Sequence, residues 1–186
     1  MEIIKTDIPN LLIIKPEVYS DPRGFFVESY AQARYQEAGI AANFIQDNIS
    51  KSSYGVIRGL HYQLAPYSQA KLIHVIEGKI LDIAVDLRKN SPTFGQHYAV
   101  ELTAENKLQF YIPQGFAHGF SVLSETAVVS YKCDNYYSQE AERGIAYNDA
   151  TLNIDWKIPM DKAVISSKDS ILPAFKEAEH NFVYSI

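Results

Sequence analysis

Short apolar runs separated by turn signals dominate the chain. Glu77-Gly78 joins two of these runs and predicts a hairpin turn, because glycine adopts positive φ without steric cost. Strands at this spacing, with no helix between them, predict an antiparallel sandwich or barrel. The runs that predict strands are residues 11–14, 24–28, 72–76, 79–87, 97–102, 108–112, 120–123 and 127–132.

The two ends of the chain add smaller elements. Asp-Pro-Arg-Gly at 21–24 predicts a turn. Ser29 and Gln32 have capping-box spacing and Gly39 is a C-terminal stop, so we expect a short helix over residues 30–38. After residue 134 the pattern loosens, which predicts a tail that wraps the barrel and carries a short helix at 173–178. No repeat or linker divides the sequence, so residues 1–186 are expected to form one domain.

Composition and charge narrow the class. The formal net charge is −5, which argues against nucleic acid as the main partner. Cys133 is the single cysteine, so no internal disulfide can form, and a lone thiol is typical of a reducing compartment. No secretory signal and no stretch of ~18 apolar residues is present. We therefore expect a cytoplasmic protein that does not bind a membrane.

Two of the five histidines, His61 and His118, each follow a glycine-containing turn and begin a strand. The Pro-x-Gly-x-x-His spacing at 113–118 resembles the second half of a cupin metal motif. Where such motifs have further ligands in the first half, this chain has Gln63 and then Lys71. Glutamine is a poor metal ligand, and the lysine cation opposes a bound metal ion. The sequence therefore predicts no metal.

Without a metal, His61 is free to act as a general base, since an imidazole ordinarily titrates near pH ~6.5. It needs a carboxylate to orient it, and both Asp82 and Asp169 are candidates. Tyr131 lies in a strand with a neighbouring tyrosine pair and could donate a proton from the opposite side. Each residue taken alone is equally well explained by strand-end hydrogen bonding or aromatic packing.

Several polar residues suit a nucleotide. Arg23 and Arg58 each precede a glycine, and the planar guanidinium fits a diphosphate. Glu28, Gln46 and Asn48 could read a nucleobase edge, although polar residues are common at strand ends.

Together, these segments resemble the dTDP-4-dehydrorhamnose 3,5-epimerase family. The resemblance covers most of the chain and rests on ordered motifs at 21–28, 46–52, 56–63, 82–88, 91–95, 113–120 and 166–169. It implies a double-stranded β-helix of the cupin or jelly-roll type. It also implies a homodimer, in which an N-terminal strand of one subunit completes the site of its neighbour, and catalysis without a cofactor.

The resemblance further implies roles for individual residues. His61 matches the base, Asp169 its partner, Tyr131 the acid and Lys71 the lysine near the C4 oxygen of the sugar. The substrate would be dTDP-4-keto-6-deoxy-D-glucose, inverted at C3 and C5 to give dTDP-4-keto-L-rhamnose. The residues implied to bind the substrate are Arg23, Phe26, Glu28, Gln46, Asn48, Arg58, His118 and Tyr136.

Other functions stay open at the level of sequence. An epimerase acting at C3 alone or C5 alone would need the same groups. A metal-dependent cupin enzyme would use His118, and a non-catalytic barrel would bind a sugar nucleotide without exchanging its protons. The chain also departs from the family at 144–147, where Gly-Ile is followed by Ala-Tyr and not by tryptophan, and over the variable segment 63–71.

Overall fold

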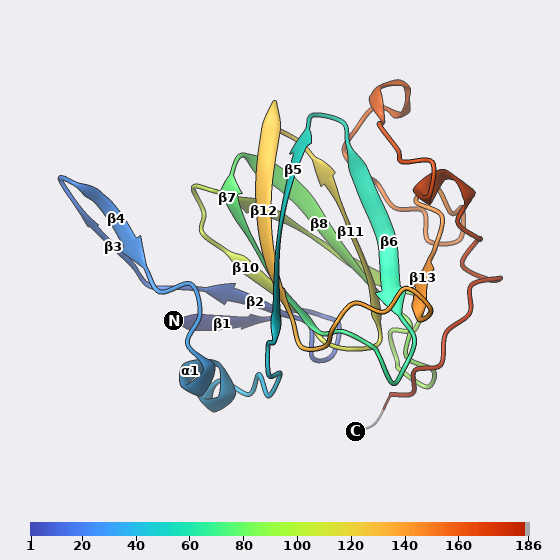
Figure 1. Ribbon diagram of the computed structural model, residues 1–186, viewed down its shortest axis with the longest axis horizontal. Coiled ribbons are helices and arrows are strands. Elements are labelled where there is room, and N and C mark those ends of the chain that lie inside the picture. The colour runs from blue at the N-terminus through green and yellow to red at the C-terminus, as the bar shows by residue number, and fades with distance from the viewer. Residues whose placement is uncertain (185–186) are drawn as a thin grey trace.

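The computed structural model describes residues 1–184, which form two antiparallel sheets that face each other (Figure 1). One sheet has six strands, in the order β1 (Glu2–Lys5), β2 (Leu12–Lys15), β10 (Gln109–Ile112), β7 (Lys71–Glu77), β12 (Thr126–Cys133) and β5 (Gln46–Ser53). The other has five, in the order β13 (Glu142–Gly144), β6 (Ile57–Gln63), β11 (Phe116–Val122), β8 (Lys79–Asp86) and β9 (His97–Thr103). This arrangement confirms the predicted all-β class.

The main core lies between the sheets. Ile73 and Val129 of the six-stranded sheet pack in it with Ile80 and Phe120 of the five-stranded sheet, each no more than 4% exposed. The turn between β7 and β8 falls at Gly78, with φ of +78°, as predicted.

The C-terminal tail covers the outer face of the five-stranded sheet, as predicted. Leu152, Trp156 and Phe182 of the tail are buried in a second apolar cluster with Ile83 and other residues of the sheet. This cover explains why β8 is buried from Ile80 to Asp86 on both faces and does not alternate between buried and exposed positions.

The prediction of a helix at 173–178 is wrong, because that segment forms a turn and irregular structure. Its backbone groups bond to other segments: the Phe175 N–H donates to Asp149 Oδ2 at 2.8 Å, and the Pro173 carbonyl accepts from the Ala146 N–H at 2.8 Å. The tail instead carries two single-turn 3₁₀ helices, η1 (Met160–Lys162) and η2 (Asp169–Ile171).

The N-terminal helix α1 (Gln32–Glu37) is shorter than predicted. Gly39, with φ of +87°, follows its C-cap residue Ala38, as expected for the stop. Ser29 does not cap it. Ala31 holds the N-cap position, and the Ser29 carbonyl accepts hydrogen bonds from Tyr35 and Gln109. Within residues 1–184 no helix has the length and apolar character needed to cross a bilayer.

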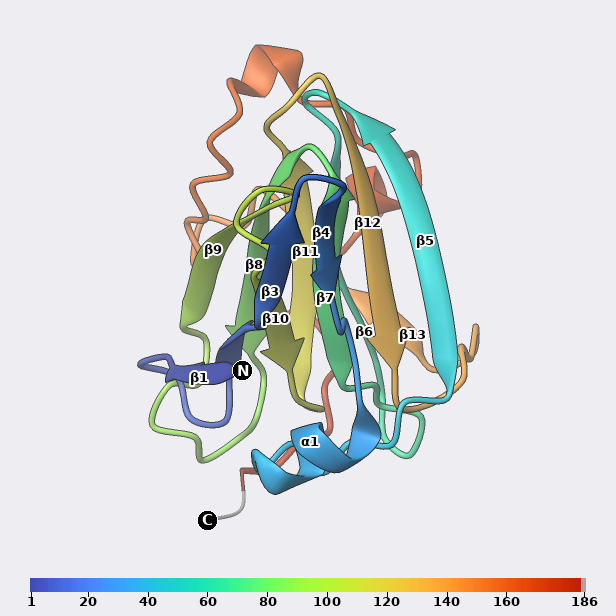
Figure 2. The ribbon, with the colours of Figure 1, turned by 90° about the vertical axis from the view of Figure 1, so that its left-hand side faces the viewer.

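A two-stranded hairpin, β3 (Val18–Asp21) and β4 (Gly24–Val27), projects from the two sheets (Figures 1 and 2). Gly24 occupies the predicted turn with φ of +128°. Tyr19, Phe25 and Phe26 are 56%, 58% and 67% exposed on it. Such exposed aromatic side chains on a projecting element are typical of an interaction surface.

Candidate active site

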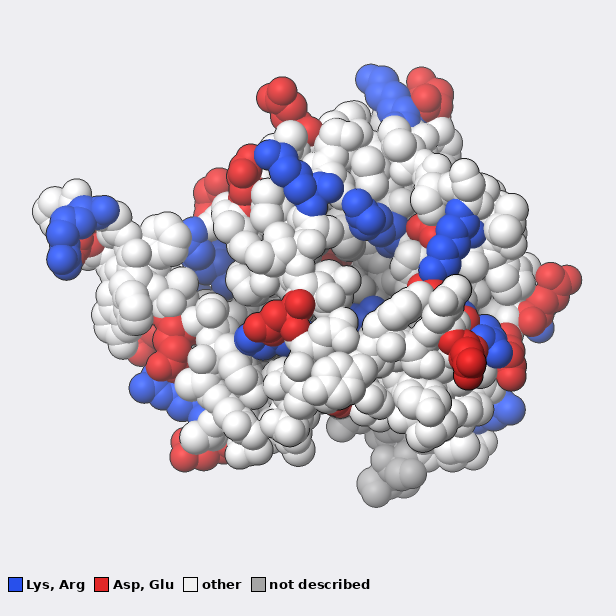
Figure 3. All heavy atoms as spheres, in the orientation of Figure 1, with Lys and Arg blue, Asp and Glu red and all other residues white. Residues whose placement is uncertain are grey.

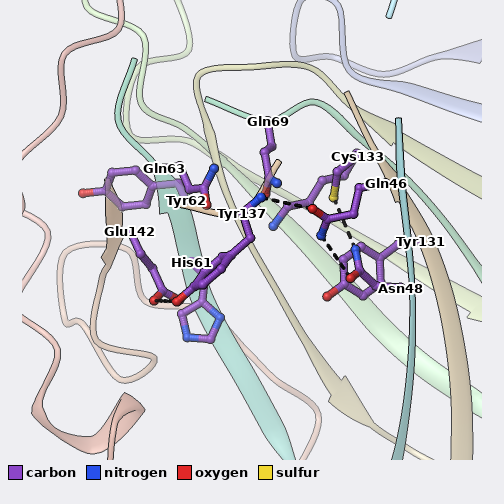
Figure 4. Close-up of a pocket in the computed structure, with 11 residues that line it drawn as sticks. Gln46, Asn48, His61, Tyr62, Gln63, Gln69, Tyr131, Cys133, Tyr137 and Glu142 are labelled. Carbon is purple, nitrogen blue, oxygen red and sulfur yellow. Dashed lines mark hydrogen bonds between the residues drawn. The ribbon is translucent and has the colours of Figure 1, made fainter. Parts of the chain in front are cut away.

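A cavity of about 330 Å³ lies between strands of the two sheets, and Figure 3 shows the hollowed face with basic side chains around the hollow. Strands β5, β7 and β12 contribute from one sheet, and β6 and β13 from the other. The lining residues are Gln46, Asn48, His61, Tyr62, Gln63, Gln69, Lys71, Tyr131, Cys133, Tyr137 and Glu142 (Figure 4).

His61 enters the cavity from β6 and is held from behind by Asp169. Its Nε2 lies 2.7 Å from Asp169 Oδ1, and the second carboxylate oxygen accepts the Gly59 N–H at 3.2 Å. Burial alone would raise the pKa of Asp169, but the hydrogen bond and charge of His61 and the Gly59 N–H outweigh burial, so this pKa is lowered. An ionised Asp169 fixes the proton on Nε2, which leaves Nδ1 as the nitrogen with a free lone pair.

Two glycines set the position of this strand. A Cβ on Gly59 would lie 2.6 Å from the Gly119 Cα, and one on Gly119 would lie 2.7 Å from the Arg58 carbonyl oxygen. Only glycine permits β6 and β11 to approach this closely, immediately beside the paired residues His61 and His118.

The structure resolves which aspartate faces which histidine. Asp82 Oδ1 lies 2.8 Å from His118 Nε2, whereas Asp169 contacts His61. His118 is only 8% exposed and lies behind the cavity instead of lining it. Among residues 1–184, no three His, Cys, Asp or Glu side chains converge as metal ligands.

Tyr131 and Lys71 line the cavity from the six-stranded sheet, and Figure 4 shows His61 and Tyr131 on opposite sides of it. Burial raises the pKa of Tyr131, so its phenol keeps its proton at neutral pH. Burial lowers the pKa of Lys71, although the nearby Cys133, Asp82 and Glu142 oppose that shift. The cavity therefore holds a proton acceptor on one sheet and a proton donor and an amine on the other.

The predicted amides Gln46 and Asn48 also line the cavity, from the edge strand β5. Gln46 Nε2 donates to Asn48 Oδ1 at 3.1 Å, while Gln46 Oε1 accepts the Tyr137 N–H at 3.0 Å. These bonds hold both amides at one end of the cavity.

Besides Asp169 and His118, five predicted residues lie outside this lining. Arg58 is exposed on β6, where Nε donates to Ser52 Oγ at 3.0 Å, and its charge acts on Tyr131. Tyr136 is 64% exposed, and the next residue, Tyr137, lines the cavity in its place. The other three, Arg23, Phe26 and Glu28, lie on the hairpin or directly after it.

Six lining residues were not predicted from the sequence: Tyr62, Gln63, Gln69, Cys133, Tyr137 and Glu142. Strand alternation could have found two of them, because Gln63 follows His61 and Cys133 follows Tyr131 at a spacing of two. Glu142 lies on β13, a three-residue strand in a segment without a strand pattern. No sequence signal marked it.

A β-barrel cavity that opposes a carboxylate-supported imidazole to a phenol defines an acid–base enzyme, one that removes a proton from one face of a substrate and returns one to the other. Comparisons with known proteins identify the enzyme family within this class. The family model described as dTDP-4-dehydrorhamnose 3,5-epimerase matches residues 5–177. The chain belongs to this family.

Individual relatives agree over nearly the whole chain. The dTDP-4-dehydrorhamnose 3,5-epimerase of Shigella flexneri is 51% identical over 181 residues, 97% of this chain and 99% of the relative. The crystal structure of the Elizabethkingia anophelis enzyme matches with a TM-score of 0.91 and 56% identity, covering 95% of this chain and 97% of that one. The Legionella pneumophila enzyme, in complex with dTDP-4-keto-L-rhamnose, matches with a TM-score of 0.91 and 49% identity, over 95% and 93%. The fold is therefore the cupin type of these enzymes, as predicted.

Proposed function

We propose that the chain is an isomerase that inverts C3 and C5 of dTDP-4-keto-6-deoxy-D-glucose to give dTDP-4-keto-L-rhamnose, in dTDP-rhamnose biosynthesis. One observation carries the catalytic assignment: His61 and Tyr131 enter the same cavity from different sheets. A sugar ring held between them would present one face to the imidazole and the other to the phenol.

The chemistry follows from the ketone at C4. It acidifies the C–H bonds at C3 and C5, because loss of either proton gives an enolate. His61 takes the proton at Nδ1, and the C–H electron pair moves into the enolate. Lys71 stabilises the negative charge on O4 electrostatically. Tyr131 then donates its proton to the opposite face of the carbon, which inverts the centre. No hydride moves, so the scheme uses no redox cofactor.

The nucleotide end of the substrate is assigned to polar groups at the edge of the cavity. Arg58 lies on the same strand as His61 and supplies a guanidinium for the diphosphate. Gln46 and Asn48 face the same cavity with amide groups. His118 acts behind the cavity, where it supports β6 opposite His61.

The hairpin supports a further proposal, that two copies of the chain form a homodimer. On the projecting hairpin, the side chain of Arg23 is 90% exposed and Phe26 is 67% exposed. Neither residue lines the cavity of its own subunit. In the dimer, the hairpin of one subunit would reach the partner's cavity and bring Arg23, Phe26 and the adjacent Glu28 to the nucleotide. Tyr136 is assigned to the same rim, beside Tyr137.

Two broader assignments belong to this proposal. A single epimerase domain spans residues 1–186, since the two sheets share one core and the tail packs onto the second sheet. A cytoplasmic location is favoured by the single buried thiol, Cys133.

The proposal is tested by incubating the protein with dTDP-4-keto-6-deoxyglucose in D₂O and reading the product by NMR. We expect deuterium at both C3 and C5, each with inverted configuration. Inversion at one carbon alone would replace the double epimerase with a monoepimerase. Tight dTDP binding without any exchange would identify a binding protein.

A further inference from the structure

A second, smaller hollow of about 180 Å³ adjoins the catalytic cavity at His61. Its other walls come from β13 and the C-terminal tail. The residues that line it are His61, Glu142, Arg143, Gly144, Lys168, Leu172, Pro173 and Glu179. Within the described part of the chain, His61 and Glu142 are the two residues that border both spaces. The imidazole therefore faces the substrate cavity and has a separate opening beside β13.

Glu142 is held at this junction by two contacts to a single oxygen. The Tyr137 hydroxyl donates to Oε2 at 2.8 Å, and Lys168 Nζ lies 2.5 Å from the same atom. For Oε1, residues 1–184 provide no hydrogen-bond donor, which leaves this oxygen for water. Figure 4 shows the Glu142 carboxylate and the Tyr137 hydroxyl together near His61.

The negative charge of the Glu142 carboxylate is suited to proton transfer. Burial would raise the pKa of Glu142, but the bonds from Lys168 and Tyr137 and the charges of Lys168 and His61 lower it overall. Glu142 is therefore an anion near His61 that does not retain a proton for long.

Double inversion creates a need for such a group. After the first C–H bond breaks, the proton is on His61 Nδ1. After the new C–H bond forms, Tyr131 is a phenolate. A second inversion by the same base requires His61 to lose that proton and Tyr131 to gain another, with a sugar nucleotide still occupying the cavity. In the proposed function the sugar ring would occupy the cavity on one side of the imidazole, and the second hollow gives His61 a separate opening.

We propose that Glu142 and the second hollow form the route by which His61 releases its proton to solvent between the two inversions. This inference rests on the proposed function. The N–H bond at Nδ1 breaks, the proton passes by way of Glu142 or a water bound to its Oε1, and water in the hollow receives it. Tyr131 recovers its proton from solvent in a separate transfer.

The test is the Glu142→Gln variant, with Glu140→Gln as the matched control, because Glu140 is an exposed carboxylate of the same segment that borders neither space. We expect Glu142→Gln to lower the rate of double inversion on the order of 10²-fold, the lower end of what a positioned proton-transfer group contributes. The initial product should be enriched in sugar inverted at one carbon. Added imidazole buffer should restore double inversion in a concentration-dependent way, whereas a structural defect would not respond to buffer.

A second variant, Leu172→Trp, should narrow the hollow while leaving the Glu142 residue in place. It tests the proton route even if Glu142→Gln does not fold. It should show the same excess of singly inverted product. An unchanged product ratio in the folded variants, with no dependence on buffer, overturns the proton route. If the wild-type protein itself inverts neither carbon, the proposed function fails instead, so the two failures are distinguishable.

Discussion

Lys71 is an amine enclosed between two sheets, and its surroundings set the pH range in which it can stabilise an enolate. Burial lowers its pKa. The groups that face it are Cys133 on β12, Asp82 on β8, Glu142 on β13 and the His118 imidazole on β11, and the first three act to raise the pKa. In the proposed mechanism Lys71 acts in its charged form, so we expect activity below this pKa and its loss as the pH rises through it.

We expect kcat to fall on the alkaline side at a pH below the ordinary lysine value of about 10.4. Tyr131 does not account for this fall, because burial raises its pKa. In Lys71→Arg the guanidinium stays charged to above about pH 12, so the alkaline limb should move upward even though kcat is lower. The check is the pH profile of kcat for both proteins. An identical limb in the variant would show that Lys71 is not the titrating group.

The sequence could indicate Tyr131 because it lies in a predicted strand, and His61 because it follows a glycine-containing turn. The role of Lys71 was implied only by the family resemblance. The sequence could not choose between Asp82 and Asp169, because the pairing of each with a histidine is a tertiary contact between distant segments. Tyr136 was predicted where Tyr137 lines the cavity, since these residues follow the end of β12 and alternation no longer applies.

At the scale of elements, the close approach of β6 and β11 positions His61, the proposed base. Gly59 and Gly119 make that approach possible, and the register between the two strands shifts next to His118. A side chain at either glycine would push β6 away from β11 and move His61 with it.

Gly59→Ala should therefore destabilise the protein more than Gly24→Ala does. Both glycines have similar positive φ, +122° and +128°, so the backbone strain is matched, but only Gly59 has close neighbours for a new Cβ. We expect an additional loss of about 1–3 kcal/mol in the free energy of unfolding, the usual range for an overpacked core, and a lower kcat. Denaturant unfolding of both variants measures the difference in the free energy of unfolding. Equal losses of this free energy in the two variants would show that packing at Gly59 is unimportant.

Most strands from β7 to β12 could be predicted from apolar runs and from turns such as Glu77-Gly78, whereas β1, β5 and β6 have no such run. The element at 173–178 could not, because its helix-like composition is overridden by bonds to Asp149 and Ala146. Strand β13 is defined by its pairing with β6 rather than by any local pattern.

At the scale of the whole molecule, the proposed dimer would use the projecting hairpin to complete each active site with residues of two chains. In the isolated chain, Arg23 and Phe26 do not line the cavity, and their side chains are strongly exposed. The sequence resemblance could imply this arrangement, but no property of one chain can define the partner's position.

Subunit mixing tests the proposed dimer. His61→Ala and Arg23→Ala should each have low activity alone. After unfolding and refolding together, random pairing gives mixed dimers in which one of the two sites has both residues intact, so about a quarter of wild-type activity should return. If Arg23 serves its own subunit, mixing restores nothing. Light scattering of each variant before mixing confirms that both form dimers.

The central claim is that an imidazole and a phenol act on opposite faces of one sugar ring. Its most direct test compares Tyr131→Phe and His61→Ala with dTDP-4-keto-6-deoxyglucose in D₂O, by NMR at C3 and C5. Tyr131→Phe should still exchange protons for deuterium with retained configuration, because the base remains, while His61→Ala should exchange neither. Inverted product from Tyr131→Phe at the wild-type rate, or exchange by His61→Ala at that rate, would contradict the claim.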